Sequence, residues 1–242
     1  MNRLRGWIHR AIRRLFQIVL RNLRGAEYEL DPAVPLTALF SLGGRRAVAL
    51  LRGNLRLIIF RQSVGLVFIG RGAEIRNIKQ ITFGRGVTLD RDVLIDGLSR
   101  DGVRLGNGVS VGRSSILRCT GVLSSIGVGI DIGDNSGLDA FCFIGAAGGV
   151  RIGKDVIMGQ HVSFHAEEHN FDSVTIPIKH QGTRRSGIVV EDDCWIGSNV
   201  TFLDGAHVGR GCVIGSGAVV RGTIPEYSVA VGVPARVVRS RK

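Results

Sequence analysis

Hydrophobic residues recur at every sixth position through the C-terminal half of the chain, separated mostly by polar residues and glycine. The longest unbroken run consists of Val190, Ile196, Phe202, Val208, Ile214 and Val220. Shorter runs with the same spacing are Ile152, Met158 and Phe164; Ile132, Leu138 and Ile144; Leu105, Val111 and Leu117; and Phe83, Leu89 and Ile95. A period of six fits neither a 3.6-residue helix nor simple strand alternation. It fits short strands joined by tight turns in three-sided coils of about 18 residues, so residues 63–223 are predicted to form an all-β parallel β-helix.

Small residues occupy a second regular position, four residues after the first five members of the longest run. They are Cys194, Val200, Ala206, Cys212 and Ala218. Both positions are expected to point into the coil, where a larger side chain at the second would overpack the corner. Cys142, Cys194 and Cys212 fall on this small position and are therefore predicted to be buried structural thiols. Cys119 lies off it, and the repeat does not explain it.

The N-terminal segment follows a helical period instead. At 100° per residue seven apolar side chains fall within an arc of about 120°, with most of the arginines opposite and Arg5 and Asn22 as exceptions; the apolar residues are Leu4, Ile8, Ile12, Leu15, Phe16, Val19 and Leu23. This pattern predicts a basic amphipathic helix within residues 1–24, part of a helical segment over residues 1–62. Two interpretations remain open: peripheral contact with an anionic membrane, or packing against the chain's own domain. A second basic, apolar stretch, "ALLRGNLRLIIF", favours the membrane, while no apolar stretch is long enough to span one.

The distribution of charge also separates the N-terminal segment from the repeat region. The net charge is +12 over 242 residues, and residues 1–62 hold twelve arginines against three acidic residues. Nucleic-acid binding would favour basic residues interleaved with aromatics over a folded surface, and aromatics make up only 6% of the chain, so we expect no nucleic-acid partner. The four cysteines form no CxxC pair and no export signal precedes them, which predicts reduced thiols in a cytoplasmic protein.

The six-residue period breaks at residues 166–187, within the stretch "SFHAEEHNFDSVTIPIKHQGTRRSG" that carries three of the six histidines. A rigid prism has no pocket of its own. We therefore expect this segment to be an extruded loop that supplies one wall of a site.

The repeat, its "IG" corners and the stretch "DCWIGSNVTFLDGAHVGRGCVIGSGAVVRGTIPEYSVAVGVPARVVR" resemble the hexapeptide-repeat acyltransferases, and among them the sugar O-acetyltransferases such as galactoside and maltose acetyltransferases. The motifs "HNFD", "IPIKHQG" and "GVPARVV" look closest to the branch acting in surface-polysaccharide synthesis. The resemblance implies a left-handed β-helix, a homotrimer, acetyl-coenzyme A bound between subunits, and a carbohydrate acceptor that receives the acetyl group directly.

On the acceptor side, His169 in "EEHNFD" matches the family's catalytic histidine, and the chemistry implied is general-base removal of a sugar hydroxyl proton. Glu167 or Glu168 is expected to orient its ring. The substrate-binding candidates are Asp139, where some relatives have a sugar-binding asparagine, together with His165 and Trp195. The histidines do not match the metal-binding arrangement of related carbonic anhydrases, so no metal is expected.

On the donor side, the resemblance places the thioester at the backbone of Gly197 and Ser198 and the pantetheine arm at Ser216. Arg221, Arg236 and Arg239 match positions near the nucleotide and its phosphates, and residues 224–242 are expected to form a coenzyme A-contacting tail. The family often has threonine and lysine where this chain has Arg221 and Gly222, which weakens the match there.

The predicted function is therefore acetyl-CoA-dependent O-acetylation of a sugar hydroxyl, in surface polysaccharide or glycolipid biosynthesis. Three alternatives remain open: an N-acetyltransferase of an amino sugar, a small-molecule (xenobiotic) acetyltransferase, and a non-enzymatic trimeric scaffold. No serine or cysteine lies in a recognisable nucleophile motif, which favours transfer without an acyl-enzyme.

Overall fold

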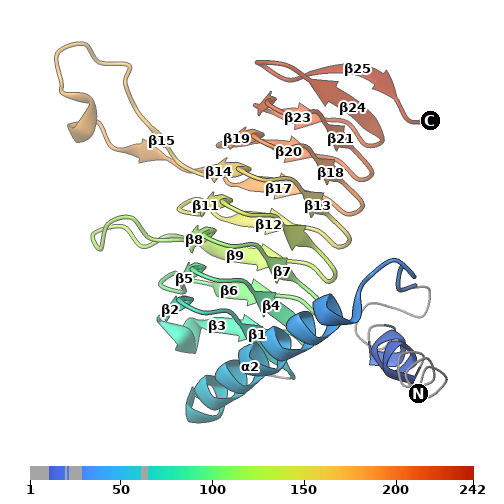
Figure 1. Ribbon diagram of the computed structural model, residues 1–242. Helices are drawn as coiled ribbons and strands as arrows, with labels where there is room; N and C mark the ends of the chain where they lie inside the picture. The colour runs from blue at the N-terminus through green and yellow to red at the C-terminus, as the bar shows by residue number, and fades with distance from the viewer. Residues whose placement is uncertain (1–10, 20, 22–28, 61–64) are drawn as a thin grey trace.

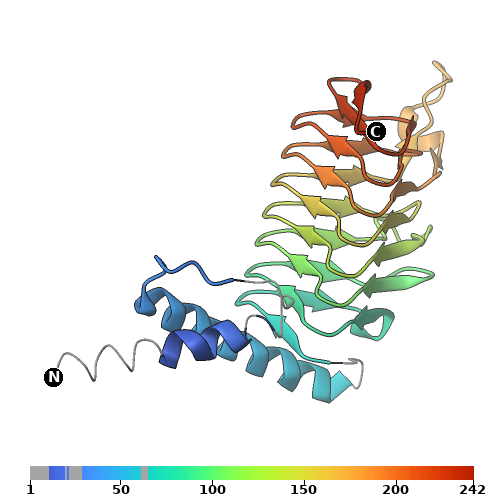
Figure 2. The same ribbon diagram turned by 90° about the vertical axis from the view of Figure 1, so that its right-hand side faces the viewer.

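The computed structural model describes residues 11–19, 21, 29–60 and 65–242. Three parallel sheets wind upward as the sides of a prism, and each successive coil adds one short strand to each side (Figure 1). The coils form the left-handed parallel β-helix that the family resemblance implies. Figure 2 shows the coils stacked as layers along a single axis.

Each sheet collects one strand from each coil, and sheet B ends in an additional antiparallel strand. Sheet B consists of β1 (Val67–Ile69), β4 (Val87–Leu89), β7 (Ser110–Val111), β10 (Gly137–Leu138), β13 (Ile157–Met158), β18 (Trp195–Ile196), β21 (Val213–Ile214), β24 (Ser228–Val231) and β25 (Arg236–Ser240). Sheet C consists of β2 (Glu74–Arg76), β5 (Leu94–Asp96), β8 (Ile116–Arg118), β11 (Phe143–Gly145), β14 (Ser163–His165), β19 (Thr201–Leu203) and β22 (Val219–Val220). Sheet A consists of β3 (Ile81–Phe83), β6 (Gly102–Leu105), β9 (Gly129–Ile132), β12 (Val150–Ile152), β17 (Ile188–Val190), β20 (His207–Val208) and β23 (Thr223–Ile224).

The corner where the chain turns from sheet B into sheet C, here called the B–C edge, comprises residues 70–73, 90–93, 112–115, 139–142, 159–162, 197–200 and 215–218. One residue of each turn has a positive φ: Gly72, Asp92, Ser114, Phe141, His161, Asn199 and Gly217. The turns stack from coil to coil through backbone hydrogen bonds, such as Ser114 N–H to the Arg91 carbonyl at 3.0 Å. The residues of this edge therefore form vertical columns.

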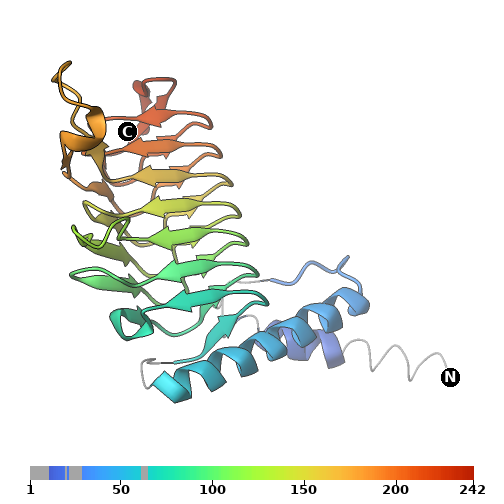
Figure 3. The same ribbon diagram turned by 90° about the vertical axis from the view of Figure 1, so that its left-hand side faces the viewer.

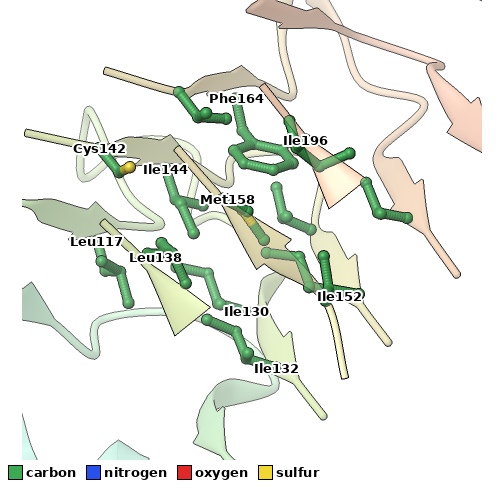
Figure 4. Packing of buried hydrophobic residues seen from close by; sticks show 14 of the residues in the cluster. Leu117, Ile130, Ile132, Leu138, Cys142, Ile144, Ile152, Met158, Phe164 and Ile196 are labelled. Atoms are coloured by element: carbon green, nitrogen blue, oxygen red, sulfur yellow. The ribbon is translucent and has the colours of Figure 1, made fainter. Parts of the chain in front are cut away.

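The interior of the prism confirms the six-residue pattern. All members of the longest run are at most 1% exposed, and so are the five small residues that follow them. Figure 4 shows Ile144, Met158, Phe164 and Ile196 pointing into the shared core. The rings of Phe164 and Phe202 stack with centroids 4.5 Å apart, so the core continues without a break from one coil to the next.

The four cysteines are free and buried. Burial of Cys142, Cys194 and Cys212 confirms the prediction made for the small position. Cys119 also faces the core, because it lies one residue beyond the paired strand residues Arg118 and Gly145, in the same column as Ala146. This end-of-strand position is a second small inward site in sheet C.

Helix α2 (Leu36–Phe60) lies across the base of the prism beside β1 (Figure 3). The contact is close, since a Cβ atom at Gly53 would collide with the carbonyl oxygen of Val67. Two arginines fasten the helix to sheet B: Arg46 donates to the Thr88 hydroxyl and Arg52 to the Ile69 carbonyl, both at 2.8 Å.

The predicted N-terminal amphipathic helix is described in part. Residues 11–19 are helical, whereas residues 1–10, 20 and 22–24 of the predicted element lie outside the described residues. Phe16 contacts Phe40 of α2 edge-on, with centroids 6.3 Å apart, while Leu15 and Val19 remain exposed. The predicted apolar arc is therefore divided, with one part packed on α2 and the other facing solvent. Among the described helices, none is long and apolar enough to cross a membrane.

Two loops leave the prism at the corner between sheets C and A, here called the C–A edge (Figure 1). The first, residues 120–128, connects β8 to β9. The second, residues 166–187, connects β14 to β17 and contains β15 (Glu168–His169), the short 3-10 helix η2 (Ile178–His180) and β16 (Thr183–Arg184). A further 3-10 helix, η1 (Ile78–Gln80), lies at the same corner lower down.

Candidate active site

The loop of residues 166–187, here called the histidine loop, is an ordered arm. Its two ends pair as antiparallel strands, with Glu168 opposite Arg184 and His169 opposite Thr183. Farther out, Gln181 ties the tip together, because its side chain accepts from the Ser173 N–H at 3.0 Å and donates to the Ser173 carbonyl at 2.8 Å. His169 is thus placed by backbone pairing on an exposed arm.

Arg185 anchors the base of the histidine loop to the prism and to the neighbouring loop. Its guanidinium forms an ion pair with Glu167 at 2.5 Å and donates to the Ser125 hydroxyl at 2.9 Å. On the far side, Asp204 accepts from the backbone N–H of Gly187 at 2.9 Å. The loop of residues 120–128, which the sequence analysis did not single out, therefore helps to hold the arm that carries His169.

The expected partners of His169 are engaged elsewhere. Glu167 pairs with Arg185, and Glu168 pairs with Arg184. Among the described residues, neither carboxylate makes a hydrogen bond to the imidazole, so pairing with arginine replaces the orienting role expected for them. His165, a predicted substrate contact, is exposed on sheet C with its ring 5.5 Å from that of Phe143.

The residues predicted for the thioester and pantetheine lie together on the B–C edge. Ser198 and Ser216 each stand two residues after a buried residue, Ile196 or Ile214, and those two residues are paired neighbours. The coils approach tightly here, since a Cβ atom at Gly197 would lie 2.5 Å from the Ser216 nitrogen. The Gly197 N–H donates to the Ile214 carbonyl at 2.8 Å and is already used in the ladder.

The neighbouring amide differs. Within the described residues the Ser198 N–H has no backbone acceptor, and its nitrogen lies close to the coil below, where a Cβ atom added at Gly159 would be 2.7 Å away. Trp195, three residues earlier, is 56% exposed on the outer face of sheet B. Asp139 lies lower on the same edge, where its carboxylate accepts from the Ala140 N–H at 2.7 Å.

The predicted phosphate-binding arginines divide between two places. Arg236 and Arg239 lie on β25, which pairs antiparallel with β24 at the end of sheet B, and both are exposed. Arg221 follows β22 and therefore lies near the C–A edge, across sheet C from the other two. Strands β23 and β24 continue the prism into residues 224–242, where the sequence predicts a coenzyme-contacting tail.

A single chain consequently holds the candidate residues in two groups. Asp139, Trp195, Gly197, Ser198 and Ser216 lie on the B–C edge or sheet B, with Arg236 and Arg239 at the top. His165, His169 and Arg221 lie on sheet C or beyond the C–A edge. Across the described part of the chain, no three His, Cys, Asp or Glu side chains gather as metal ligands would.

A groove that sequence reasoning missed lies between α2 and the lower coils of sheet B. It has a volume of about 1150 Å³ and reaches upward to Asp139 and Ile157. Arg71, Arg91 and Arg113 line one side of it. The spacing of these arginines could have been noticed in the sequence, because each follows a buried residue of the repeat by two positions.

Comparison with known proteins confirms the hexapeptide repeat. Residues 187–222 match the family described as bacterial transferase hexapeptide (six repeats). The chain is 36% identical over 183 residues to Rv3034c of Mycobacterium tuberculosis, provisionally named an acetyltransferase, covering 74% of this chain and 51% of that protein. It is 33% identical over 113 residues to WbbJ of Escherichia coli strain K12, provisionally named a lipopolysaccharide biosynthesis O-acetyl transferase, covering 44% of this chain and 58% of that one. The chain thus spans about half the length of these curated relatives.

A solved structure supports the fold. A point mutant of AntD, an N-acyltransferase from Bacillus cereus, in complex with dTDP-4-amino-4,6-dideoxyglucose and coenzyme A, superposes with a TM-score of 0.51. The match covers 74% of this chain and 84% of that one at 18% identity, so it speaks to the architecture alone.

Proposed function

We propose that this protein is an acetyl-CoA-dependent O-acetyltransferase that acts on a sugar hydroxyl in surface polysaccharide or glycolipid biosynthesis. The observation that carries the proposal is His169 on a braced arm that extends from hexapeptide coils. The named roles of the curated relatives, one of them O-acetyl transfer in lipopolysaccharide biosynthesis, support the same class of reaction.

The proposed reaction is direct transfer. Acetyl-coenzyme A supplies the acetyl group as a thioester. The His169 imidazole accepts the proton of the sugar hydroxyl as its oxygen bonds to the acetyl carbon, the C–S bond breaks, and the proton passes to the leaving thiolate. In this proposal the Ser198 N–H, which has no backbone acceptor among the described residues, stabilises the negative charge that develops on the carbonyl oxygen.

The buried thiols support transfer without an acyl-enzyme. Burial raises the pKa of Cys142 to about 11 and that of Cys194 to about 12, so neither is a ready thiolate at neutral pH. Cys119, the thiol that the repeat left unexplained, is likewise buried, with its pKa raised to about 11.

The proposed assembly is a homotrimer in which neighbouring chains complete each other's sites. Within one chain, sheet C separates the histidine loop from the B–C edge. A cyclic assembly brings the C–A edge of one subunit to the B–C edge of the next, so that His169 of one chain meets Ser198 of another. The exposed apolar side chains at the loop tip, Phe171, Val174, Ile176 and Ile178, suit burial against such a neighbour.

His169→Ala tests the proposed reaction. We expect turnover of acetyl-CoA with a sugar acceptor to fall by about 10²- to 10⁴-fold, which corresponds to roughly 3 to 5 kcal/mol of transition-state stabilisation, because a positioned general base is lost. Coenzyme A affinity, measured by calorimetry, should change little. Steady-state assays with matched hydroxyl and amine acceptors report whether oxygen or nitrogen is acetylated.

His180→Ala is the matched control, since His180 is exposed on the same loop and has no assigned role. It should retain near-normal turnover. A His169→Ala variant that keeps more than about a tenth of the wild-type rate would exclude general-base catalysis by this residue.

We also propose that the N-terminal layer contacts an anionic membrane. The apolar side chains of Leu15, Ile18 and Val19 are exposed, and α2 exposes Phe40, Leu51 and Leu55, none of which lines the groove. Arginines in the same layer would attract anionic headgroups, each contributing on the order of 1 kcal/mol near the surface.

Sedimentation with phosphatidylglycerol liposomes tests this proposal. The full-length protein should sediment at low salt, raised salt should weaken binding, and deletion of residues 1–24 should remove it while leaving turnover of a soluble acceptor intact. Failure of the full-length protein to sediment at low salt would show that the N-terminal layer is only a packing element.

A further inference from the structure

The groove between α2 and sheet B has a built arrangement of positive charge. Arg71, Arg91 and Arg113 each follow by two residues a paired strand position, Ile69, Leu89 or Val111. Backbone hydrogen bonds link the three turns, from Asp92 N–H to the Arg71 carbonyl at 2.9 Å and from Ser114 N–H to the Arg91 carbonyl at 3.0 Å. The three residues are thus successive rungs of one column, spaced about 4.8 Å apart, and are called the arginine ladder here.

Among the described residues, the arginine ladder has no counterion. In the described part of the chain, no carboxylate lies within ion-pairing distance of Arg71, Arg91 or Arg113, and all three are exposed. Like charges facing each other on adjacent strands repel. A bound anion would remove that repulsion.

The opposite wall of the groove is also basic. Helix α2 contributes Arg45, Arg46 and Arg52, the last two fastened to sheet B by the hydrogen bonds described above. In all, the groove is lined by six arginines and by two aspartates, Asp90 and Asp139. Each of these carboxylates accepts the N–H of the following residue at 2.7 Å.

The floor between the two walls is hollow because of the residues on the outer face of sheet B. From the base upward these are Phe68, Thr88, Ser110, Gly137 and Ile157, each paired with the next. The two large residues stand at the ends, while the three small ones between them leave room and supply two hydroxyls. Guanidinium and hydroxyl groups around a hollow of this size suit phosphate oxygens.

From this arrangement we infer that the groove binds the phosphate or diphosphate of a phosphate-linked carbohydrate, the acceptor of the proposed acetyl transfer. The assignment of this carbohydrate as the acceptor rests on the proposed function, whereas the anion-binding site is inferred from the groove alone. A diphosphate can contact two adjacent rungs of the ladder, because bidentate guanidinium pairing fits its oxygens.

The position of the groove favours the acceptor over the acetyl donor. Ser198 and Ser216, the predicted donor contacts, occupy the same column of the B–C edge as the arginine ladder. Ser198 lies three rungs above Arg113, about 14 Å away at the usual strand spacing. Donor and acceptor phosphates would therefore lie toward opposite ends of one edge, with Asp139 between them.

Calorimetry with inorganic pyrophosphate tests the site on the full-length protein. We expect binding that weakens as salt is raised, and the double variant Arg71→Gln/Arg91→Gln should lose at least about tenfold in affinity. The matched control is Arg118→Gln/Arg151→Gln, which removes two exposed arginines from the outer faces of sheets C and A and should bind normally. A second variant, Ser110→Leu, fills the floor without changing charge and should also weaken binding.

Two further probes distinguish the possible sources of the phosphate. UDP-glucose represents a nucleotide-linked sugar and farnesyl diphosphate a lipid-linked diphosphate; tighter binding of either than of pyrophosphate, lost in the ladder variant, identifies the source. Pyrophosphate binding that is absent, or equally strong in the ladder variant, overturns the anion site. If the ladder variant instead loses coenzyme A affinity, the groove belongs to the donor and the acceptor assignment is wrong.

The test separates this inference from the proposed function. Ladder-dependent pyrophosphate binding without acetyl transfer to any sugar would leave the anion site standing and remove the proposed reaction. Normal acetyl transfer by the ladder variant, with an unchanged KM for a phosphate-linked acceptor, would leave the proposed reaction standing and show that the groove does not bind the acceptor.

Discussion

At the scale of single residues, the position of a cysteine within its coil determines whether its thiol is buried. Cys119 illustrates this, because a rule based only on the six-residue period leaves it unassigned, whereas it occupies a buried end-of-strand site. The missing signal is visible in "ILRCT" beside "FIGAA" and "SFHAE", where a small residue follows the buried one by two positions. The turn after these strands leads into loops of different length, which hides the column from a fixed period.

The buried thiols lead to a prediction about reactivity. Because burial removes access and raises the pKa of the Cys119 and Cys142 thiols to about 11, only about one thiolate in a thousand is present at pH 8. We expect iodoacetamide to label the native protein at least about a hundredfold more slowly than the urea-unfolded chain, as followed by mass spectrometry. Raising the pH toward 11 should increase labelling only as far as the core opens. Rapid modification of one thiol with loss of turnover would point to a catalytic cysteine.

Site residues could be predicted from sequence where a motif fixes them locally. His169 is exposed on an arm and the Ser198 N–H has no backbone acceptor among the described residues, while the roles of both stay predictions. Gly197 was predicted to share the amide role, but its N–H is committed to Ile214. Sequence alone does not distinguish the two, because the alternation of used and unused N–H groups depends on which side of the corner each amide faces.

At the scale of elements, the prism and its main loop could be predicted, but the support of that loop could not. The period of six gives the strands, since each coil side repeats the same inward residue. The loop of residues 120–128 has no distinctive motif, and its contact with Arg185 joins residues 60 positions apart. Such a contact depends on two loops leaving the same corner two coils apart, on either side of the coil that contains β11 and β12.

Arg185 is predicted to be a positioning residue for the histidine loop. In Arg185→Ala the links to Glu167 and Ser125 are lost, so we expect turnover to fall by about 10- to 100-fold as the arm loses its fixed position, with coenzyme A affinity nearly unchanged. Hydrogen exchange across residues 166–187 should accelerate, and Arg185→Lys should restore part of the rate. Arg151→Ala, on the outer face of sheet A, is the control. Normal exchange and normal turnover in Arg185→Ala would show that the remaining bonds suffice.

At the scale of the whole molecule, part of the basic charge lies in the groove between α2 and sheet B. The excess of arginines was predicted to belong to an N-terminal appendage, yet α2 lies against sheet B and its arginines line a groove together with those of the first coils. That arrangement could not be predicted from composition, because it depends on where α2 docks. The close approach at Gly53 and the bonds of Arg46 and Arg52 determine the docking.

Sharing of the active site between chains is a prediction about the assembled molecule. The histidine loop and the B–C edge lie on opposite sides of sheet C in one chain, so each proposed site takes its base from one subunit and its donor contacts from the next. His169→Ala and Ser198→Trp should each be inactive, the second because a bulky side chain fills the donor corner. Co-expression should give mixed trimers in which some sites combine a native loop with a native edge.

In each mixed cyclic trimer, whether two-to-one or one-to-two, one of the three sites joins a native loop to a native edge, so we expect the isolated mixed trimers to recover about a third of the wild-type turnover. Differently tagged subunits and tandem purification isolate the mixed species for assay. Mixing the two variants after separate purification, without subunit exchange, provides the control and should show no recovery. If the co-expressed trimers also remain inactive while binding coenzyme A, His169 and Ser198 do not meet across a subunit boundary, and the loop must fold back onto its own chain to act.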